Sequence, residues 1–510
     1  MSRQQRLTLI ATILGSTVVF LDSTVVNVAL PAISDNLDAG LAGQQWVVEA
    51  YMLSLVSLLL VGGSLGDQLG RRRMFVYGLI AFGACSILCA LAPSVEFLIG
   101  ARVLQGVAGA LLVPGSLAIV AATFEGAARG KAVGTWTAWT GIATVLGPAG
   151  GGALIGALSW RAIFWVNIPL IAVTVALTLH SVKESRDPDA FRGIDWLGIA
   201  LSAAGLGGPV FALIEQPTHG WSDPLVWVPL VAGIACFGLF ILHEARTRHP
   251  MMDLGLFRIR NFAIANLTTL SAYAGLIGGL FFVGLYLQQV AGYSPLEAGL
   301  ATTPISLILF VLSPRWGKLA SGTGPRLPMS VGPVVGGIGL ILLLRVGSDP
   351  SYLGDVLPAL VVFGLGLSAT VAPLTATVLD SVDERHVGIA SGVNNGISRV
   401  AGLLAIAVLG AVISAKFGSI APNVEAGPLT AEAPEASTAA FHLGVLIAGL
   451  LMIAGGIVSG LGIVNPDRRF EAVPAGGAAP AGECGHGADC DCGEGQPVTP
   501  GSEAPEPEPA

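Results

Sequence analysis

Charged residues are scarce in this chain. Asp, Glu, Lys and Arg make up 11% of its 510 residues, whereas soluble globular domains carry about 25%. Hydrophobic residues make up 53%, and the mean hydropathy is +0.75. A soluble core cannot bury so much apolar surface, which excludes a soluble protein. The composition predicts an all-α polytopic membrane protein.

The sequence also lacks the motifs of several functional classes. It has no GxxxxGK[ST] phosphate loop, which argues against an ATP-driven pump, and no HExxH zinc motif. We therefore expect neither an enzyme nor a bound cofactor. The six cysteines resemble no secreted disulfide framework, because three lie in apolar runs and three in a polar C-terminal segment. The first apolar run is too long for the core of a cleavable signal.

Apolar runs of membrane-spanning length dominate what is present. About 20 residues are needed to cross ~30 Å of hydrocarbon. Fourteen runs near this length can be counted, at residues 7–30, 46–66, 74–92, 96–122, 132–157, 162–181, 195–214, 225–243, 262–287, 298–316, 327–347, 353–378, 387–414 and 440–464.

The basic loop GSLGDQLGRRR at 63–73 orients these runs. Loops rich in Lys and Arg face the cytoplasm. With this loop inside, 20 of the 25 Lys and Arg residues fall on the cytoplasmic side. The outer side receives only Arg161, Arg345 and Lys416. We expect an even number of spans in the plasma membrane, with both termini cytoplasmic.

The chain repeats itself. The segment GKLASGTGPRL, which begins at Gly317, matches the basic loop at the pairs Gly63/Gly317, Leu65/Leu319, Gly70/Gly324 and Arg72/Arg326. We predict two pseudo-symmetric six-helix halves at 1–181 and 261–464, two inserted helices within 182–260, and a disordered cytoplasmic tail at 465–510. Two such halves with a site between them are typical of a rocking transporter.

Five motifs in order resemble one family. They are LDSTVVNVALP at 21–31, the basic loop, LIGARVLQGVAGA at 98–110, GPAGGG at 147–152 and WRAIFWVNIP at 160–169. The chain resembles the major facilitator superfamily, in particular its fourteen-span drug/proton antiporter branch (QacA/EmrB type). The resemblance implies export of amphipathic, cationic or aromatic small molecules, driven by inward proton flow. The expected partners are drug-like substrates, protons and the bilayer, with no nucleic acid, and the expected state is a monomer.

Three ionisable residues within the runs are candidates for proton coupling. A charge at membrane depth costs about 2.5–3.5 kcal/mol on insertion scales and marks a functional site by default. Asp22 is either a reversible proton carrier or a hydrogen-bonded packing residue. Arg102 needs a buried partner, and it either assists proton transfer, as the resemblance implies, or forms a static ion pair. Glu49 either binds protons or cationic drugs, or reaches the membrane interface beside Trp46 and Tyr51.

Polar and aromatic residues on shared helix faces are candidates for a substrate cavity. Residues three, four or seven apart lie on one face of a helix, and this spacing joins Arg102 to Gln105 and Asn395 to Arg399. Tyr286, on the same face as Phe282, fits the interfacial aromatic belt better than a cavity. The predicted cavity residues are Asn27, Gln105, Phe282, Gln289, Asn395 and Arg399.

The resemblance also implies two structural devices. The first is a tight, bent seam between the halves, formed by Gly147, Pro148, Gly151 and Gly152, where small residues let helix backbones touch. Ordinary close packing is the alternative. The second is a cytoplasmic gate latch in the basic loop, formed by Gly63, Asp67, Gly70, Arg71 and Arg72. A pure orientation signal is the alternative.

The C-terminal segment contains CGHGADCDC. A soft metal is one hypothesis, with ligands Cys484, His486, Cys490 and Cys492. Because the spacing matches no standard zinc pattern, we favour a disordered tail without metal. For the whole chain, two alternatives to drug export are export of a single metabolite or antibiotic, and a membrane sensor or scaffold that transports nothing.

Overall fold

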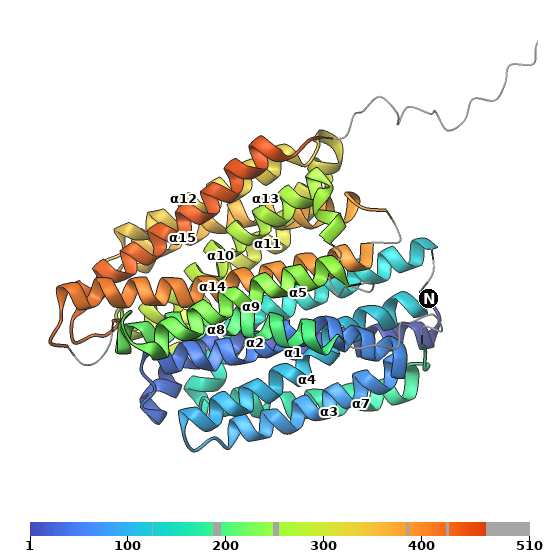
Figure 1. The fold of residues 1–510 in the computed structure, drawn as a ribbon, viewed down its shortest axis with the longest axis horizontal. Coiled ribbons are helices and arrows are strands. Elements are labelled where there is room, and N and C mark those ends of the chain that lie inside the picture. The colour runs from blue at the N-terminus through green and yellow to red at the C-terminus, as the bar shows by residue number, and fades with distance from the viewer. Residues whose placement is uncertain (125, 187–194, 248–253, 384–386, 425–427, 466–510) are drawn as a thin grey trace, which may run out of the picture. The chain divides into compact units, whose positions relative to one another are not determined.

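The computed structural model describes residues 1–124, 126–186, 195–247, 254–383, 387–424 and 428–465. Regular structure in these residues is entirely helical. Twelve of the described helices are long and apolar enough to cross a membrane. The prediction of an all-α polytopic membrane protein is therefore confirmed (Figure 1).

The first group of helices covers the N-terminal part of the chain. Within it α4 packs against α2 and α3, while α1 packs against α5 and α7. The group comprises α1 (Arg3–Leu37), α2 (Leu41–Leu69), α3 (Arg71–Ala90), α4 (Val95–Thr123), α5 (Gly126–Ala157), α6 (Ala162–Trp165) and α7 (Asn167–Ser181).

A second group follows the same order of long helices. Here α13 packs against α11 and α12, while α10 packs against α14 and α15. The group comprises η1 (Leu254–Arg258), α10 (Arg260–Gln289), α11 (Pro295–Thr323), α12 (Arg326–Leu342), η2 (Leu343–Arg345), η3 (Tyr352–Val356), α13 (Leu357–Asp380), α14 (Val387–Ile420) and α15 (Pro434–Gly462).

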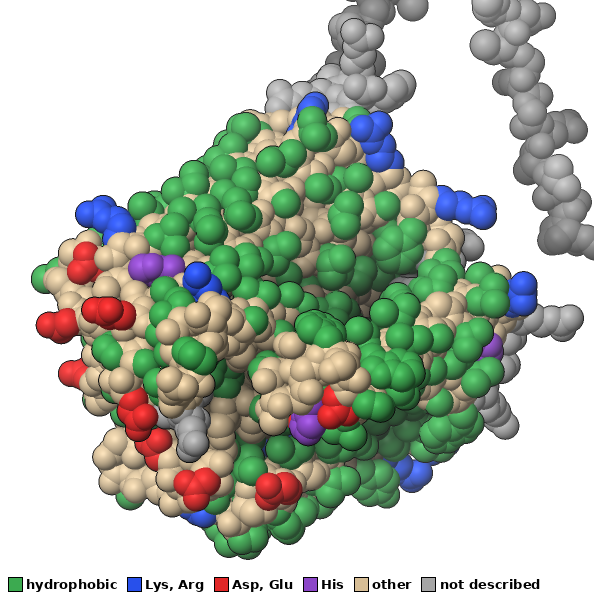
Figure 2. All heavy atoms as spheres, turned by 60° about the vertical axis from the view of Figure 1, so that its left-hand side comes forward, with side chains coloured by type: hydrophobic (Ala, Val, Ile, Leu, Met, Phe, Trp, Pro, Cys, Tyr) green, Lys and Arg blue, Asp and Glu red, His purple; other side chains and the backbone are tan. Residues whose placement is uncertain are grey.

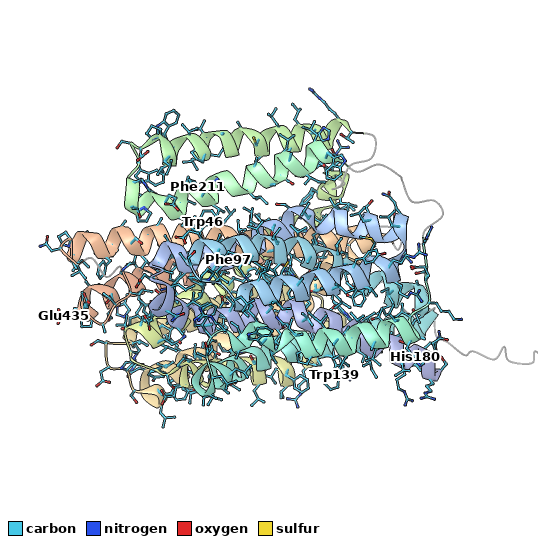
Figure 3. All side chains as sticks on the ribbon, turned by 90° about the horizontal axis from the view of Figure 1, so that it is seen from below. Trp46, Phe97, Trp139, His180, Phe211 and Glu435 are labelled. Atoms are coloured by element: carbon cyan, nitrogen blue, oxygen red, sulfur yellow. The ribbon has the colours of Figure 1, made fainter. Side chains whose placement is uncertain are left out.

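Between the groups, α8 (Trp196–His219) and α9 (Pro224–Arg246) form a hairpin. Asp195 caps α8 by accepting from the backbone N–H of Gly198 at 2.8 Å. Its carboxylate also contacts Nε2 of His243, on α9, at 2.9 Å. The hairpin docks on α2 and α14 through α8, and the rings of Trp46 and Phe211 meet at this junction, tilted by 54° with centroids 5.7 Å apart (Figure 3).

The predicted apolar runs coincide with helices. Twelve runs fall on the twelve candidate spans. The runs 46–66 and 132–157 fall on α2 and α5, helices of 29 and 32 residues that are not among those twelve. The helices extend beyond the runs because polar caps add turns that hydropathy does not register. At the start of α1, for example, Ser2 and Gln5 form a capping box.

Charge separates the two ends of the helices. We call basic end the end where α1, α3, α10 and α12 begin, which carries Arg3, Arg6, Arg71, Arg72, Arg73, Arg258, Arg260 and Arg326. We call acidic end the opposite one, which carries Asp35, Asp38, Asp223, Glu297, Asp349, Asp355, Glu432 and Glu435. Figure 2 looks obliquely onto the acidic end and shows the acidic side chains gathered there.

Among the described residues, the two groups of helices share a buried apolar core at one end only. Toward the acidic end a single cluster includes Val25 and Leu30 of α1, Phe281 of α10 and Ile305 of α11. Toward the basic end, the described residues form separate clusters. One lies among α1–α4 and α7, and another, around Phe262, lies among α10, α12, α13 and α14. The two groups are thus packed together at the acidic end.

Candidate functional site

A buried ion pair lies inside the first group of helices. Asp22 of α1 and Arg102 of α4 are 3% and 1% exposed, and an Nη1 hydrogen bond joins the guanidinium to the carboxylate. Asp22 lies at mid-length of a 35-residue helix, far from the interfaces where a charge can reach water. Each charge therefore compensates the desolvation cost of the other. The sequence prediction that Arg102 needs a buried partner is met by Asp22.

Amide and hydroxyl groups complete the coordination of this carboxylate. Gln105 Nε2 donates to Asp22 Oδ1 at 3.0 Å and approaches Ser86 Oγ at 2.9 Å. Asn167 Nδ2, from the start of α7, donates to the same Asp22 oxygen at 3.2 Å. Gln105 Oε1 in turn accepts from Arg102 Nη1 at 2.7 Å. Both amides and the serine are fully buried, so the network joins α1, α3, α4 and α7.

Arg102 also reaches α2. Its Nε donates to the backbone carbonyl of Val47 at 3.0 Å, and its guanidinium lies 4.1 Å from the ring centroid of Tyr51. A cation over an aromatic face adds about 2 kcal/mol or more when both groups are desolvated. One side chain thereby fixes α2 relative to α1 and α4. The Arg102–Asp22 pair, with its amide partners, can hold five helices of one half in a single arrangement.

Sequence reasoning missed three members of this network: Ser86, Tyr51 and Asn167. The signal for Asn167 was available, since it is a polar residue inside the WRAIFWVNIP motif, within a predicted apolar run. Ser86 and Tyr51 carry no such signal, because Ser and Tyr are common in membrane helices. Only the packing of α3 and α2 against α4 reveals them.

Glu49 contrasts sharply with Asp22. It is 0% exposed, and neither of its carboxylate oxygens has a hydrogen-bond partner among the residues that the structure describes. Of the two predicted environments, exposure at the membrane interface is wrong, because the side chain is fully enclosed. Its neighbour Trp46 donates Nε1–H to Glu215 of α8 at 3.0 Å.

Arg399 lies at the contact between the two groups of helices. It extends from α14 toward α2 and α1, with Nη1 3.8 Å from Met52 Sδ and its guanidinium 5.8 Å from the Phe20 ring. Asn27, seven residues after Phe20 on the same face of α1, is half-buried, and its Oδ1 has no partner in the described part of the chain. These positions suit a surface between the groups, and their cavity role stays a prediction.

The remaining predicted cavity residues separate into surface and core positions. Asn395 is exposed and donates to Ser391 O of its own helix at 3.0 Å, and Gln289 is half-buried near the end of α10. Phe282, at 1% exposure, packs edge-on against Phe281 inside the shared core, and Gln105 belongs to the Asp22 network. In this conformation, then, Phe282 and Gln105 lie inside packed cores.

The prediction for Tyr286 was wrong. Its side chain does not lie in an interfacial belt but stacks on Phe441, with ring centroids 4.1 Å apart. Its hydroxyl donates to Gly347 O at 2.8 Å and contacts Thr438 Oγ1 at 2.7 Å. Burial of a tyrosine is favourable when its hydroxyl finds such partners, and periodicity alone could not show them.

The glycines of the predicted seam face two helices. A Cβ on Gly147 or Gly151 would collide with Thr24 or Val25 of α1. A Cβ on Gly152 would collide with the backbone of Pro295 and Leu296 in α11. Small residues thus let α5 approach α1 within its own group and α11 of the other group, at the acidic end.

The basic loop is bound by the segment that follows α7. Gly70 ends α2 with φ +116°, a backbone conformation that favours glycine. The N–H of Arg72 donates to Glu184 Oε1 at 3.0 Å, and Arg71 N donates to Ser185 O at 3.0 Å. A Cβ added to Gly63 would lie at an ordinary contact distance from Pro114, 3.5 Å from its Cβ. The side chain of Asp67 lies outside the described residues, so its predicted latch is not placed.

The equivalent loop of the second group is bound in the same manner. Gly324 has φ +92°, and Arg326 N donates to Asn465 Oδ1 at 3.1 Å. Glu184 and Asn465 therefore occupy corresponding places, one charged and one neutral. The predicted metal ligands Cys484, His486, Cys490 and Cys492 lie outside the described residues.

Comparisons with known proteins agree with this architecture. Relatives include the multidrug resistance protein Stp of Mycobacterium tuberculosis, 37% identical over 83% of this chain and 79% of that protein. The tetracenomycin C resistance and export protein of Streptomyces glaucescens is 33% identical over 82% and 77%, and the multidrug efflux pump LfrA of Mycolicibacterium smegmatis is 33% identical over 78% and 79%.

Solved structures show the same fold at low identity. A bacterial homologue of the lysosomal transporter Spinster has a TM-score of 0.62 and 17% identity, over 90% of this chain and 98% of that one. The peptide transporter POT in complex with sulfate has a TM-score of 0.62 and 14% identity, over 89% and 95%. The Major Facilitator Superfamily model matches residues 12–406. The chain is a multi-pass membrane transporter that belongs to the major facilitator superfamily and is related to drug efflux pumps.

Proposed function

We propose that this protein exports amphipathic small molecules, cationic or aromatic, from the cytoplasm in exchange for protons. The observation that carries the proposal is a core shared at the acidic end and divided at the basic end, in a chain whose relatives are named for drug efflux and resistance. A carrier that alternates its access needs two halves that meet at one end at a time.

The proposed topology has fourteen spans and cytoplasmic termini. The twelve candidate spans together with α2 and α5 give fourteen, as in the drug/proton antiporter branch. The proposed domains are the halves 1–181 and 261–464, the inserted pair within 182–260, and the tail at 465–510. Clustering of Arg and Lys at one end supports a cytoplasmic position for the basic end.

In this topology the structure corresponds to the state closed to the outside. The Spinster homologue was solved in an inward-facing, unoccupied conformation, which fits halves divided at the basic end. Asp22, Glu49 and Arg102 are the proposed coupling residues, and Asn27, Gln289, Asn395 and Arg399 the proposed cavity surface. The glycines of α5 at the acidic end act as the outer seam, and the basic loop as the cytoplasmic gate.

Two experiments test this function. Expression in a host without its own exporters should lower sensitivity to lipophilic cations such as ethidium. In energised everted vesicles, ethidium addition should release protons from the lumen, and Asp22→Asn and Arg102→Ala should abolish the release. Resistance without any proton movement would contradict coupling, and full activity of both variants would contradict the assignment of these residues.

Export of one dedicated compound is the second candidate. It is favoured by the relative from Streptomyces glaucescens, whose name links it to tetracenomycin C. A screen over chemically diverse drugs separates the two. A broad reduction in sensitivity supports multidrug export, whereas protection against a single scaffold supports a dedicated exporter.

A further inference from the structure

The two buried acids of the N-terminal helices are in opposite states. Asp22 is held by Arg102, Gln105 and Asn167. Glu49 is enclosed to 0% exposure, and within the described part of the chain both of its oxygens are unpartnered. An ionised carboxylate in such a place is strongly disfavoured, whereas the neutral acid is tolerated. The Asp22 carboxylate is therefore compensated by its partners in this conformation, whereas the Glu49 carboxyl has no such partner among the described residues.

Neighbouring residues show where Glu49 lies on α2. One turn earlier, Gln45 Nε2 donates to Ile406 O of α14 at 2.8 Å, and three residues later Met52 contacts Arg399 of α14. Trp46 and Leu53, seven residues apart, form the next face of α2, which contacts α8. Trp46 donates to Glu215 of α8, and a Cβ on Gly207 of α8 would lie 3.1 Å from Leu53. Glu49 lies on α2 between the face that contacts α14 and the face that contacts α8, so its side chain points into the junction of the three helices.

This junction has apolar walls. The buried cluster there contains Val210 and Ile214 of α8 with Leu403 and Ala407 of α14. The charged side chains on the helices packed against α2 are engaged elsewhere or at a distance. Asp22 and Arg102 pair with each other and Glu215 pairs with His219 at 3.7 Å, while Arg399 contacts Met52 and Phe20. Among the described residues none forms an ion pair with Glu49.

We propose that Glu49 is the proton-binding residue of the transport cycle and that the inserted helix α8 forms one wall of its site. The inference rests on the proposed antiport and divides the roles of its coupling residues. The Asp22–Arg102 pair positions α2, because Arg102 Nε holds the carbonyl of Val47, two residues before Glu49. Glu49 carries the proton, and α8 keeps lipid and water away from it.

The contacts around Glu49 give its carboxyl group a different environment in the outward-open and inward-open states. Opening to the outside must separate α14 from α2, which breaks the Gln45–Ile406 bond and admits water to Glu49 from the acidic end. There the carboxylate takes one proton and becomes neutral, so that closure can bury it. On the cytoplasmic side, Arg399 lies about one turn nearer the basic end, and its approach to Glu49 would stabilise the carboxylate and release the proton into the inner cavity.

Glu49→Gln tests the proton site. The substitution keeps the shape of the neutral acid, so ethidium exchange between equal concentrations should persist, whereas proton-driven ethidium accumulation should fall at least tenfold and lose its pH dependence. Glu215→Gln, a carboxyl change at the same junction, should retain both activities. Glu49→Asp should restore accumulation with a shifted pH midpoint.

The outcomes separate this inference from the function on which it rests. If wild-type vesicles show no ethidium-dependent proton release, the antiport itself is wrong. If the wild type releases protons and Glu49→Gln does so equally, Glu49 is not the carrier. If Glu49→Gln neither exchanges nor accumulates ethidium, Glu49→Asp decides, since failure of a variant that keeps the carboxyl also contradicts the proposal.

A second variant tests the wall. Val210→Asn places an amide donor on α8 at the junction, where it should favour the ionised carboxylate and move the pH midpoint of accumulation to lower pH by about one unit. Leu197→Asn, on the same helix but 55% exposed, should leave the midpoint unchanged. If the pH midpoint of accumulation does not shift in Val210→Asn, α8 does not form a wall of the Glu49 site.

Discussion

The sixth long helix of each half is held by different forces. In the N-terminal half Asn167 begins α7 and binds the charged network through Asp22 and Ser86. In the C-terminal half α15 meets α12 through glycines, where a Cβ on Gly449 would lie 2.8 Å from Gly337 O. Its buried hydroxyl contact is the neutral Thr268–Ser459 pair at 2.7 Å, and the arginines that reach it, Arg260 and Arg326, donate to backbone carbonyls near its end.

This difference shows two solutions to one problem. In a bilayer the hydrophobic effect does not press helices together, so they associate through close packing and hydrogen bonds. Glycine seams give a large, non-directional contact that tolerates small sliding. A buried ion pair with several donors specifies one arrangement, and it fails when one member is lost. We therefore expect the N-terminal half to be more sensitive to changes of charge and the C-terminal half to changes of volume.

The largest effect is expected from Arg102→Ala. Loss of the guanidinium leaves the Asp22 carboxylate buried without a cation, which costs about 3–5 kcal/mol. Thermal unfolding of the purified protein in detergent should occur at a markedly lower temperature. The double variant Asp22→Asn with Arg102→Gln should recover much of the loss. Equal stability of the single variant and the wild type would show that the pair is not structural.

The next largest effect is expected from overpacking the glycine contact between α12 and α15. In Gly337→Val the new side chain would collide with the backbone of α15 at Gly449 and Ile453, at a cost of about 1–3 kcal/mol. The same unfolding assay measures it. Gly238→Ala on α9, where a Cβ meets nothing within 4 Å, is the control and should not destabilise. A neutral effect of Gly337→Val would mean that α12 and α15 do not need close approach.

A smaller loss is expected from Asn167→Ala. It removes the amide donor to Asp22 but leaves Gln105 and Arg102 in place, so the cost should be about 1–3 kcal/mol for the unsatisfied groups. Thr174→Val is the matched control on α7, because its hydroxyl donates to Leu170 O of its own helix, at 2.7 Å, and joins no other helix among those described. Comparable losses in the two variants would argue against a special role for Asn167.

The smallest effects are expected from substitutions of the two capping residues, Glu184 and Asn465, which should differ in their dependence on salt. Both cap the helix that follows a positive-φ glycine, but Glu184 also lies 3.7 Å from Arg73 Nε, with side chains 25% and 59% exposed. Exposed pairs contribute about 0.2–1 kcal/mol and are screened by salt. The measurement is hydrogen exchange of the backbone amides at the starts of α3 and α12. Glu184→Gln should reduce the protection of α3, by an amount that shrinks as salt is raised. Asn465→Ala should reduce the protection of α12 by an amount that does not depend on salt. Identical salt dependence would contradict the comparison.

The sequence by itself determined the helical class, the positions of the apolar runs and the correspondence of the two loops. Hydropathy and charge vary along the chain over the length of one helix, so these patterns can be recognised in the sequence without knowledge of tertiary contacts. Spacing also indicated that Arg102 and Gln105 share a face and that Arg102 requires a partner.

Tertiary structure alone decided which partners meet. Asp22 lies 80 residues from Arg102 and 145 from Asn167, and no local pattern encodes such contacts. The same holds for Tyr286, which periodicity placed in the interfacial belt and packing placed in the core. Glu49 shows the reason most clearly. Its chemistry depends on the lack of a partner among the described residues at the junction of three helices, and that property belongs to the packing and not to any stretch of sequence.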